Sequence, residues 1–287
     1  MSDPAEREKA DATFCAELVR SSDFERYAAT LFVNPDQRRM LLSLYAFNSE
    51  IARVRKQISQ PLAGEIRLQW WDDLLNGTAH GDAAANPVAA ELLRTVERFR
   101  LPRERLRGMV DAHRFDLYDE PMPTMAELQA YLRDTASSLL ALGAQALNEG
   151  LPVDDAAPYH AGLAIGTVRI IEALPRHASH RQVYLPVDRL MEAQVDPHDI
   201  VAGTATEQLR SLLRQMALEA RAHLQEALAH LSSMPKSSRR VFLPLTMVGR
   251  ALDRIEAQDY DPFAPQPVSR LRLLTSMWFR ARAFDRL

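Results

Sequence analysis

Carboxylates that could hold a divalent metal ion are the first candidates for chemistry in this 287-residue chain. Mg²⁺ prefers oxygen ligands, and two carboxylates four residues apart lie on one face of a helix. Asp188 and Glu192 have this spacing, but we expect them at an exposed helix start. Asp111 and Asp116 are five residues apart, which separates them by about 140° around a helix. Neither pair predicts a metal site by itself.

Glu50 and Glu172 are two further candidates, and each lies within a few residues of an arginine. A buried arginine needs a carboxylate partner, so both glutamates are expected to form internal ion pairs with Arg53, Arg55 or Arg169. The alternative interpretation is that they bind a metal ion inside the fold.

Histidines suggest a zinc site, with His177 and His180 close together and His160 as a third candidate. Structural zinc sites usually add cysteine, and none lies nearby, so we predict no metal here. The lone Cys15 excludes an internal disulfide framework and has no catalytic context. The sequence contains no G-x-S-x-G, P-loop or GxGxxG motif.

Composition is that of a globular protein, with 47% apolar and 25% charged residues. A net charge of −3 gives no reason to expect a nucleic acid partner. The polar N-terminus is not a secretory signal, and no apolar run approaches the roughly 18–20 residues of a membrane span. We therefore expect a cytoplasmic protein, with any membrane contact peripheral and at the inner membrane.

Helical periodicity dominates the chain, and proline or Ser/Thr/Asn/Asp residues mark most helix starts. Asn34-Pro35-Asp36 opens a helix through Ile51, and Thr206 opens another that runs to about Leu231. We predict an all-α fold of about ten helices in one domain, residues 13–287. Residues 1–12 are expected to be disordered or loosely ordered.

Four segments occur in the order of a known family. They are Leu44–Phe47 (LYAF), Met109–Leu117 (MVDAHRFDL), Glu127–Tyr131 (ELxxY) and Arg181–Pro186 (RQVYLP). Together they resemble the squalene and phytoene synthases. The resemblance runs from about Phe14 to about Arg282 and implies the single-domain helical bundle of the isoprenoid (terpenoid) synthases.

The chain is more similar still to one branch of that family, the phytoene synthase-like assembly factors of respiratory complex I. The residues that carry this resemblance are YAFNSEIARVRKQIS from Tyr45, IRLQWW from Ile66, Tyr131–Leu140 and Glu172–Pro186. The match is therefore spread along the chain and is not confined to one motif.

The resemblance also shows what is missing. Synthases hold Mg²⁺ against a substrate diphosphate with a DDxxD after LYAF and an aspartate-rich NxxRDxxED helix before YLP. Aligned on Tyr45, the first motif falls on Ala52, Arg53 and Lys56. Aligned on Tyr184, the second falls on Ala173 and His177.

The change in charge at these positions is large. One cation about 4 Å from a divalent ion costs on the order of 8 kcal/mol at an effective dielectric near 20, as an upper bound. We expect no Mg²⁺ site like that of the synthases. If the cations Arg53, Arg55, Lys56, Arg169, Arg176, His177 and Arg181 point inward, the pocket could bind a phosphate or an anionic lipid head group without metal. The alternative, to which we give equal weight, is that these cations lie at helix ends and are exposed to solvent.

By this resemblance, we predict a non-catalytic family member that supports assembly of respiratory NADH:quinone oxidoreductase. It would bind a subunit or assembly intermediate, or an isoprenoid diphosphate or lipid ligand, without a cofactor. The expected pocket residues are Asn48, Glu50, Arg53, Arg169, Glu172 and Arg176.

Two alternatives remain open from the sequence. One is an active head-to-head prenyltransferase that uses Mg²⁺ and rearranged carboxylates, namely Glu50, Asp111, Asp116 and Glu172. The other is an interaction scaffold whose cavity is filled. An open or a plugged cavity between the Phe47 and Ile170 helices would help to separate them.

Overall fold

The computed structural model describes residues 3–79, 85–264 and 269–286, and within these ranges it contains helices and no strand. The α-helices are α1 (Pro4–Ser22), α2 (Phe24–Ala29), α3 (Pro35–Ala52), α4 (Pro61–Asn76), α5 (Pro87–Phe99), α6 (Arg103–Ala112), α7 (Met125–Leu132), α8 (Ser138–Leu147), α9 (Ala156–Glu172), α10 (Leu174–Ser179), α11 (Val187–Glu192), α12 (Pro197–Val201), α13 (Glu207–His230), α14 (Leu245–Ile255) and α15 (Arg270–Arg286). The predicted all-α bundle is confirmed.

Short non-α segments connect or interrupt these helices. They are the 3₁₀ segments η1 (Thr30–Phe32), η2 (Val54–Gln57), η4 (Phe115–Tyr118), η6 (Leu231–Ser233) and η7 (Ser238–Phe242), and the π-helical turn η5 (Arg133–Ser137). The stretch from Met125 to Leu147 is thus divided into α7, η5 and α8. The stretch from Ser238 to Ile255 is divided in the same way into η7 and α14.

Helix starts follow the caps in the sequence. The Asn34 side chain accepts a hydrogen bond from the backbone of Gln37 at the start of α3, and Thr206 accepts one from Leu209 at the start of α13. The N-terminus differs from the expectation, because α1 begins at Pro4 and buries Asp11, inside the segment expected to be loosely ordered. Residues 1 and 2 of that segment lie outside the described residues.

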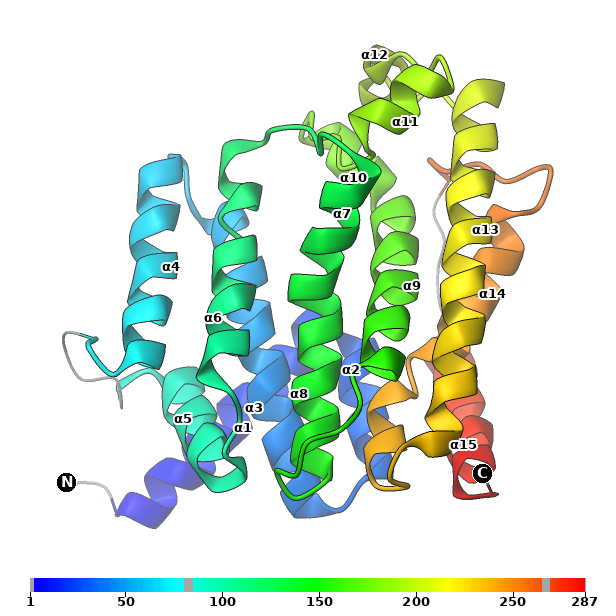
Figure 1. Cartoon of the computed structure of the whole chain (residues 1–287). Coiled ribbons are helices and arrows are strands. Elements are labelled where there is room, and N and C mark those ends of the chain that lie inside the picture. Colours follow the sequence, from blue (N-terminus) through cyan, green and yellow to red (C-terminus); the bar gives the residue numbers. More distant parts are fainter. Residues whose placement is uncertain (1–2, 80–84, 265–268, 287) are drawn as a thin grey trace.

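Helix α9 is the central element of the bundle. Twelve of its 17 residues are buried, and it packs most extensively on α13 and on η5 and α8 (Figure 1). Gly162 permits the close approach to η5, because a Cβ there would lie 2.1 Å from the Ser137 hydroxyl oxygen. That hydroxyl donates to the Tyr159 carbonyl oxygen at 2.9 Å.

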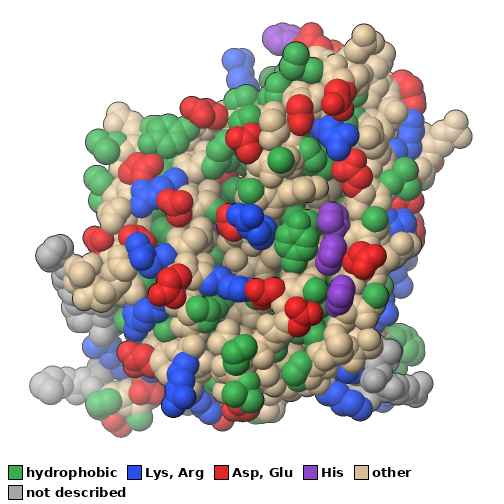
Figure 2. Space-filling model, viewed as in Figure 1, with side chains coloured by type: hydrophobic (Ala, Val, Ile, Leu, Met, Phe, Trp, Pro, Cys, Tyr) green, Lys and Arg blue, Asp and Glu red, His purple; other side chains and the backbone are tan. Residues whose placement is uncertain are grey.

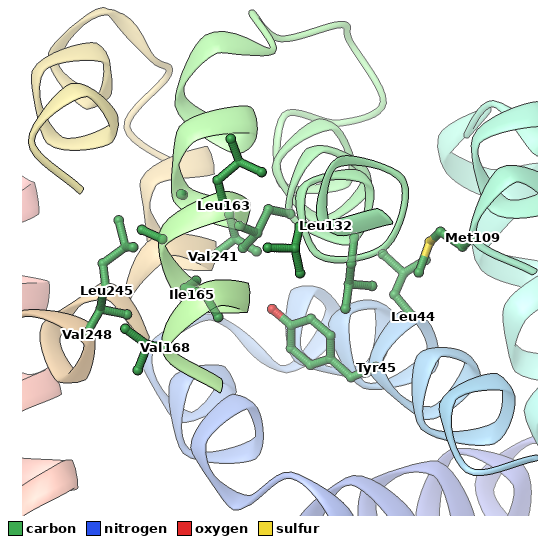
Figure 3. Packing of buried hydrophobic residues seen from close by; sticks show 14 of the residues in the cluster. Leu44, Tyr45, Met109, Leu132, Leu163, Ile165, Val168, Val241, Leu245 and Val248 are labelled. Carbon is green, nitrogen blue, oxygen red and sulfur yellow. The ribbon is translucent and has the colours of Figure 1, made fainter. Parts of the chain in front are cut away.

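Apolar side chains fill the interior between α3 and α9. Tyr45 extends from α3 toward α9, where Leu132 and Ile165 lie near its ring (Figure 3). Tyr45, Phe47 and Ile171 are all buried, so this part of the interior is packed. In the described part of the chain, no helix combines the length and apolar character needed to cross a bilayer.

Candidate functional site

The two segments at the expected metal-motif positions lie at one end of the bundle. The first segment, around Arg53 and Lys56, comprises the C-terminal end of α3 together with η2. The second segment, around Ala173 and His177, comprises the C-terminal end of α9 together with α10, and both lie at the top of Figure 1. Asp119, just after η4, joins them, because it accepts hydrogen bonds from the Arg55 guanidinium and from the Gln182 side-chain amide. The fold thus keeps the proximity of the two segments that a metal cradle requires.

The charge at this end is opposite to that of a metal cradle. Burial and the Arg176 guanidinium lower the pKa of Lys56. Burial, followed by Arg176 and Lys56, lowers the pKa of His177 to about 4. In the described ranges, neither Lys56 nor Arg176 forms an ion pair with a carboxylate. These donors do not fit Mg²⁺, which needs oxygen ligands that carry negative charge.

Asp116 and His113 are buried, and they form a hydrogen-bond cluster with the partly buried Tyr131 and Tyr184, which we call the Asp116 cluster. Its carboxylate lies 2.8 Å from His113 Nδ1 and accepts hydrogen bonds from the Tyr131 and Tyr184 hydroxyls at 3.1 Å each. Burial, followed by the Asp116 charge, raises the pKa of both tyrosines, so they remain protonated donors. Through these two hydroxyls, Asp116 ties α7 and the YLP segment to η4.

The remaining carboxylates of the prenyltransferase alternative lie apart. Glu50 pairs with Arg53 on the same helix turn, and Asp111, whose side chain is 83% exposed, lies 3.4 Å from Arg114. Glu172 forms a 2.6 Å ion pair with Arg254 of α14. Across the described residues, no group of three or more His, Cys, Asp or Glu side chains is placed to hold a metal ion.

Arg169 belongs to a second internal cluster, the Arg169 cluster, with Asp23, Glu25 and Arg26 of the α2 region. The Arg169 guanidinium lies 3.2 Å from Asp23 and 3.5 Å from Glu25, and Arg26 lies 3.0 Å from Asp23. Burial alone would raise the pKa of Asp23, but Arg169 and Arg26 lower it. The pKa of Glu25 is raised, mainly by burial. Arg169 therefore serves an internal partner and is not a free phosphate ligand.

A pocket of about 240 Å³ opens beside this cluster, between α2, α9, α14 and α15. Apolar side chains form much of its wall, and charged side chains from the helices meet there. The full lining is Phe24, Glu25, Ile165, Val168, Arg169, Glu172, Met247, Val248, Ala251, Arg254, Arg270 and Leu273. The lining thus brings apolar surface and charged groups together in one pocket.

Sequence reasoning placed some of these residues and missed others. Of the six expected pocket residues, only Arg169 and Glu172 line this pocket. Asn48 is half-buried on α3, Glu50 and Arg53 pair with each other, and Arg176 is exposed on α10. Asp23, Glu25 and Arg254 were not predicted. Asp23 had a local signal as a helix cap, whereas Arg254 gave none, because its partner Glu172 is 82 residues away.

The histidines of the zinc hypothesis are not together. His177 packs on the Tyr184 ring with centroids 4.6 Å apart, and His180 lies beside Ser179 and the Arg176 carbonyl oxygen. His160 instead faces His223 across α9 and α13, with 2.8 Å between their Nδ1 atoms, and stacks on His230. Figure 2 shows histidine side chains in a row on this face.

Known proteins with similar sequences match most of the chain. The family model of squalene/phytoene synthase matches residues 19–278. The chain is 32% identical to human NADH dehydrogenase (ubiquinone) complex I, assembly factor 6, over 88% of this chain and 76% of that protein. It is 27% identical to tomato (Solanum lycopersicum) chloroplastic phytoene synthase 2, over 87% of this chain and 81% of the relative.

Solved structures agree on the fold. A dehydrosqualene synthase with bound ligand superimposes with a TM-score of 0.83 at 16% identity, covering 99% of both chains. A squalene synthase from Alicyclobacillus acidocaldarius gives a TM-score of 0.76 at 22% identity, covering 91% of this chain and 98% of that one. With the family model matched over most of its length, the chain belongs to the squalene/phytoene synthase family.

Proposed function

We propose that this chain is a non-catalytic member of its family that supports assembly of respiratory NADH:quinone oxidoreductase, complex I. One observation carries the proposal. The chain is similar over 88% of its length to proteins named complex I assembly factor 6, while cations and alanines stand at the metal-motif positions. A fold that keeps its packing but presents cations where a synthase presents carboxylates is suited to binding and not to ionising an allylic diphosphate.

The arrangement of the carboxylates supports the non-catalytic part. A prenyltransferase with rearranged ligands would need several carboxylates around one ion. Glu50 and Glu172 each face an arginine, and Asp116 accepts hydrogen bonds from two tyrosines. Freeing any one of them for a metal would leave a buried or half-buried partner without its hydrogen bonds, which opposes the rearrangement.

The ligand part of the proposal concerns the pocket beside Arg169. Its volume of about 240 Å³ lies below the range of about 300–1,000 Å³ typical of pockets for drug-sized ligands. This size supports one isoprenoid or lipid chain and opposes two substrates side by side. Arg270 would bind its anionic end, because Arg169 and Arg254 are already paired with Glu25 and Glu172.

Assembly is tested by deleting the gene in the cells that express it. We expect loss of assembled complex I on native gels and loss of NADH:quinone oxidoreductase activity in membranes, with succinate dehydrogenase activity unchanged as the control. Wild type and Glu50→Gln should restore complex I equally, because Glu50 has no catalytic role in this proposal. Normal complex I in the deletion strain contradicts the assembly role.

The enzyme alternative is tested separately with purified protein. Farnesyl and geranylgeranyl diphosphate with Mg²⁺ are expected to give no product. Turnover that Glu50→Gln abolishes would show an active prenyltransferase. Isothermal titration with farnesyl diphosphate tests the pocket, and the absence of heat both with and without Mg²⁺ would favour a bare interaction scaffold.

A further inference from the structure

The outer face of α15 exposes large apolar side chains that share one side of the helix. Leu271, Trp278 and Phe279 are 72%, 41% and 68% exposed. Positions 271, 275, 278 and 282 follow the helical repeat, and Phe279 lies beside them. A helix of a soluble bundle usually places polar residues on this side, so this face needs an explanation.

The inner face of α15 is already satisfied. Leu273, Met277, Ala281 and Phe284 are buried in the core, and the helix packs on α14, α2 and η7. Arg270 also lies over the Phe24 ring of α2, with 4.4 Å to its centroid. The exposed side chains are therefore not needed for packing in the core. The helix can stay packed on the bundle while its outer face binds a partner.

The charge of α15 indicates which kind of partner its exposed side chains bind. Between Arg270 and Phe284 the sequence carries four arginines and no acidic residue, in a chain whose net charge is −3. The Arg282 guanidinium lies 3.6 Å from the centroid of the Trp278 ring, so cation and aromatic ring form one surface. Arginine, tryptophan and leucine on one helix face are typical of helices that lie in the interface of an anionic bilayer.

A second apolar face, on α4, provides the contrast. Leu62 and Ile66 are 69% and 65% exposed, and Tyr118 of η4 is 52% exposed beside them. Helix α4 carries Glu65, Asp72 and Asp73 against a single arginine, Arg67. Similar apolar exposure with the opposite charge disfavours an anionic lipid surface on this side.

We propose that the outer face of α15 docks on an anionic phospholipid bilayer. The helix lies in the plane of the interface, with Leu271, Trp278 and Phe279 at the level of the upper acyl chains. Arg272 and Arg282 extend to lipid phosphates, which their long side chains can reach while the aromatic rings stay buried. This surface is on a different side of α15 from the pocket and does not depend on the proposed role in complex I assembly.

The test uses the full chain and vesicles of phosphatidylcholine, with or without phosphatidylglycerol, in a sedimentation assay. Wild type is expected to bind the mixed vesicles at low salt and to be released at high salt. Arg272→Gln with Arg282→Gln should weaken binding about 25-fold, since each arginine near an anionic surface contributes about fivefold. Leu271→Ser with Phe279→Ser should also reduce binding, whereas the matched Leu62→Ser with Ile66→Ser should not.

Three outcomes would overturn the proposal. The first is equal binding of both vesicle types, or of neither, by wild-type protein. The second is a loss of binding in the α4 variant as large as that in the α15 variants. The third is a dimer, seen by light scattering, that the α15 changes dissociate without any vesicle binding, since the face would then join two copies. Circular dichroism establishes that each variant is folded, so that loss of binding reports on the surface.

Discussion

The Asp116 cluster and the Arg169 cluster differ in how they accommodate a carboxylate inside the helical bundle. Asp116 is held by two tyrosine hydroxyls and a histidine ring nitrogen, and no arginine or lysine of the described residues forms an ion pair with it. Asp23 keeps its charge through two arginines. Hydrogen bonds to a single buried charge are difficult to replace, whereas an ion cluster can often be exchanged for neutral side chains. The two clusters should therefore respond differently to mutation.

The largest effect is expected from Asp116→Ala. It leaves the Tyr131 and Tyr184 hydroxyls and His113 without their acceptor in a buried site, and each such group costs about 1–3 kcal/mol. We expect unfolding in urea to show a loss of about 4 kcal/mol. Asp111→Ala, on the neighbouring helix and exposed, is the control and should change stability by less than about 0.5 kcal/mol. A loss in Asp116→Ala as small as that of the control would show that the cluster does not hold the YLP segment.

The next effect tests whether the Arg169 cluster is replaceable. Arg169→Met leaves Asp23 and Glu25 facing each other, and we expect a loss of about 2–3 kcal/mol in the free energy of unfolding. The expected loss in stability is smaller than for breaking a fully buried ion pair, because the Arg169 side chain is 36% exposed at the pocket.

Adding Asp23→Asn and Glu25→Gln to Arg169→Met should recover most of this loss. Asparagine can still cap α2, as Asp23 does by accepting a hydrogen bond from the Arg26 backbone, and no unpaired carboxylate remains. The free energy of unfolding of the triple variant is measured in urea. The control is the double variant Asp23→Asn with Glu25→Gln, which keeps Arg169. A triple variant less stable than Arg169→Met would show that the ion cluster is as irreplaceable as the Asp116 cluster.

The sequence predicted the fold well because its signals are local. Asn34, Pro35 and Thr206 act at the ends of their own helices, and the period of apolar residues marks the buried faces. The π-turn η5 has no such local signal, and it lies where Ser137 closely approaches Gly162 of α9. A local pattern reads such a segment as continuous helix.

The candidate site was predicted less completely. The pairing of Glu50 with Arg53 was expected, since the two residues are one helix turn apart. The pairing of Glu172 with Arg254 was not, since it depends on how α14 packs against α9. Tyr131 and Tyr184 were noticed as motif residues, but only the folded chain shows that both donate to Asp116. The sequence shows which charged residues are present and which of them are close along a helix. Pairs between distant helices depend on tertiary packing.

A smaller effect concerns His177, which packs on Tyr184 at the edge of the Asp116 cluster. Its pKa is lowered from 6.5 to about 4, so the unfolded chain binds this proton more readily than the folded one. The contribution of neutral His177 to stability is therefore complete above about pH 6.5 and declines as the pH falls toward 4. We expect wild type to lose about 1–2 kcal/mol more than His177→Gln over this window. Parallel stability curves for the two proteins would contradict the assignment.

The smallest effect tests whether the cations at the former metal-motif positions act on the Asp116 cluster at all. Arg176 is the second largest cause of the low pKa of His177, after burial. Arg176→Gln should raise the pKa of His177 by about half a unit, as expected for one charge screened by water at a few ångströms. The imidazole proton shifts in an NMR titration give the measurement, and Arg181→Gln serves as the control, because Arg181 is not among the main causes of the low pKa of His177.

An unchanged pKa in Arg176→Gln would mean that α10 turns its cations to solvent and that Arg176 does not contribute to the low pKa of His177. A rise would mean that the cations share an electrostatic environment with His177, which contacts the ring of Tyr184. In that case, the end of the bundle with the expected metal-motif positions would contain two neighbouring regions of different character. Lys56 of η2 and Arg176 of α10 would be available to an anion, while Asp116 would stay bound to the two tyrosine hydroxyls and unavailable to any metal.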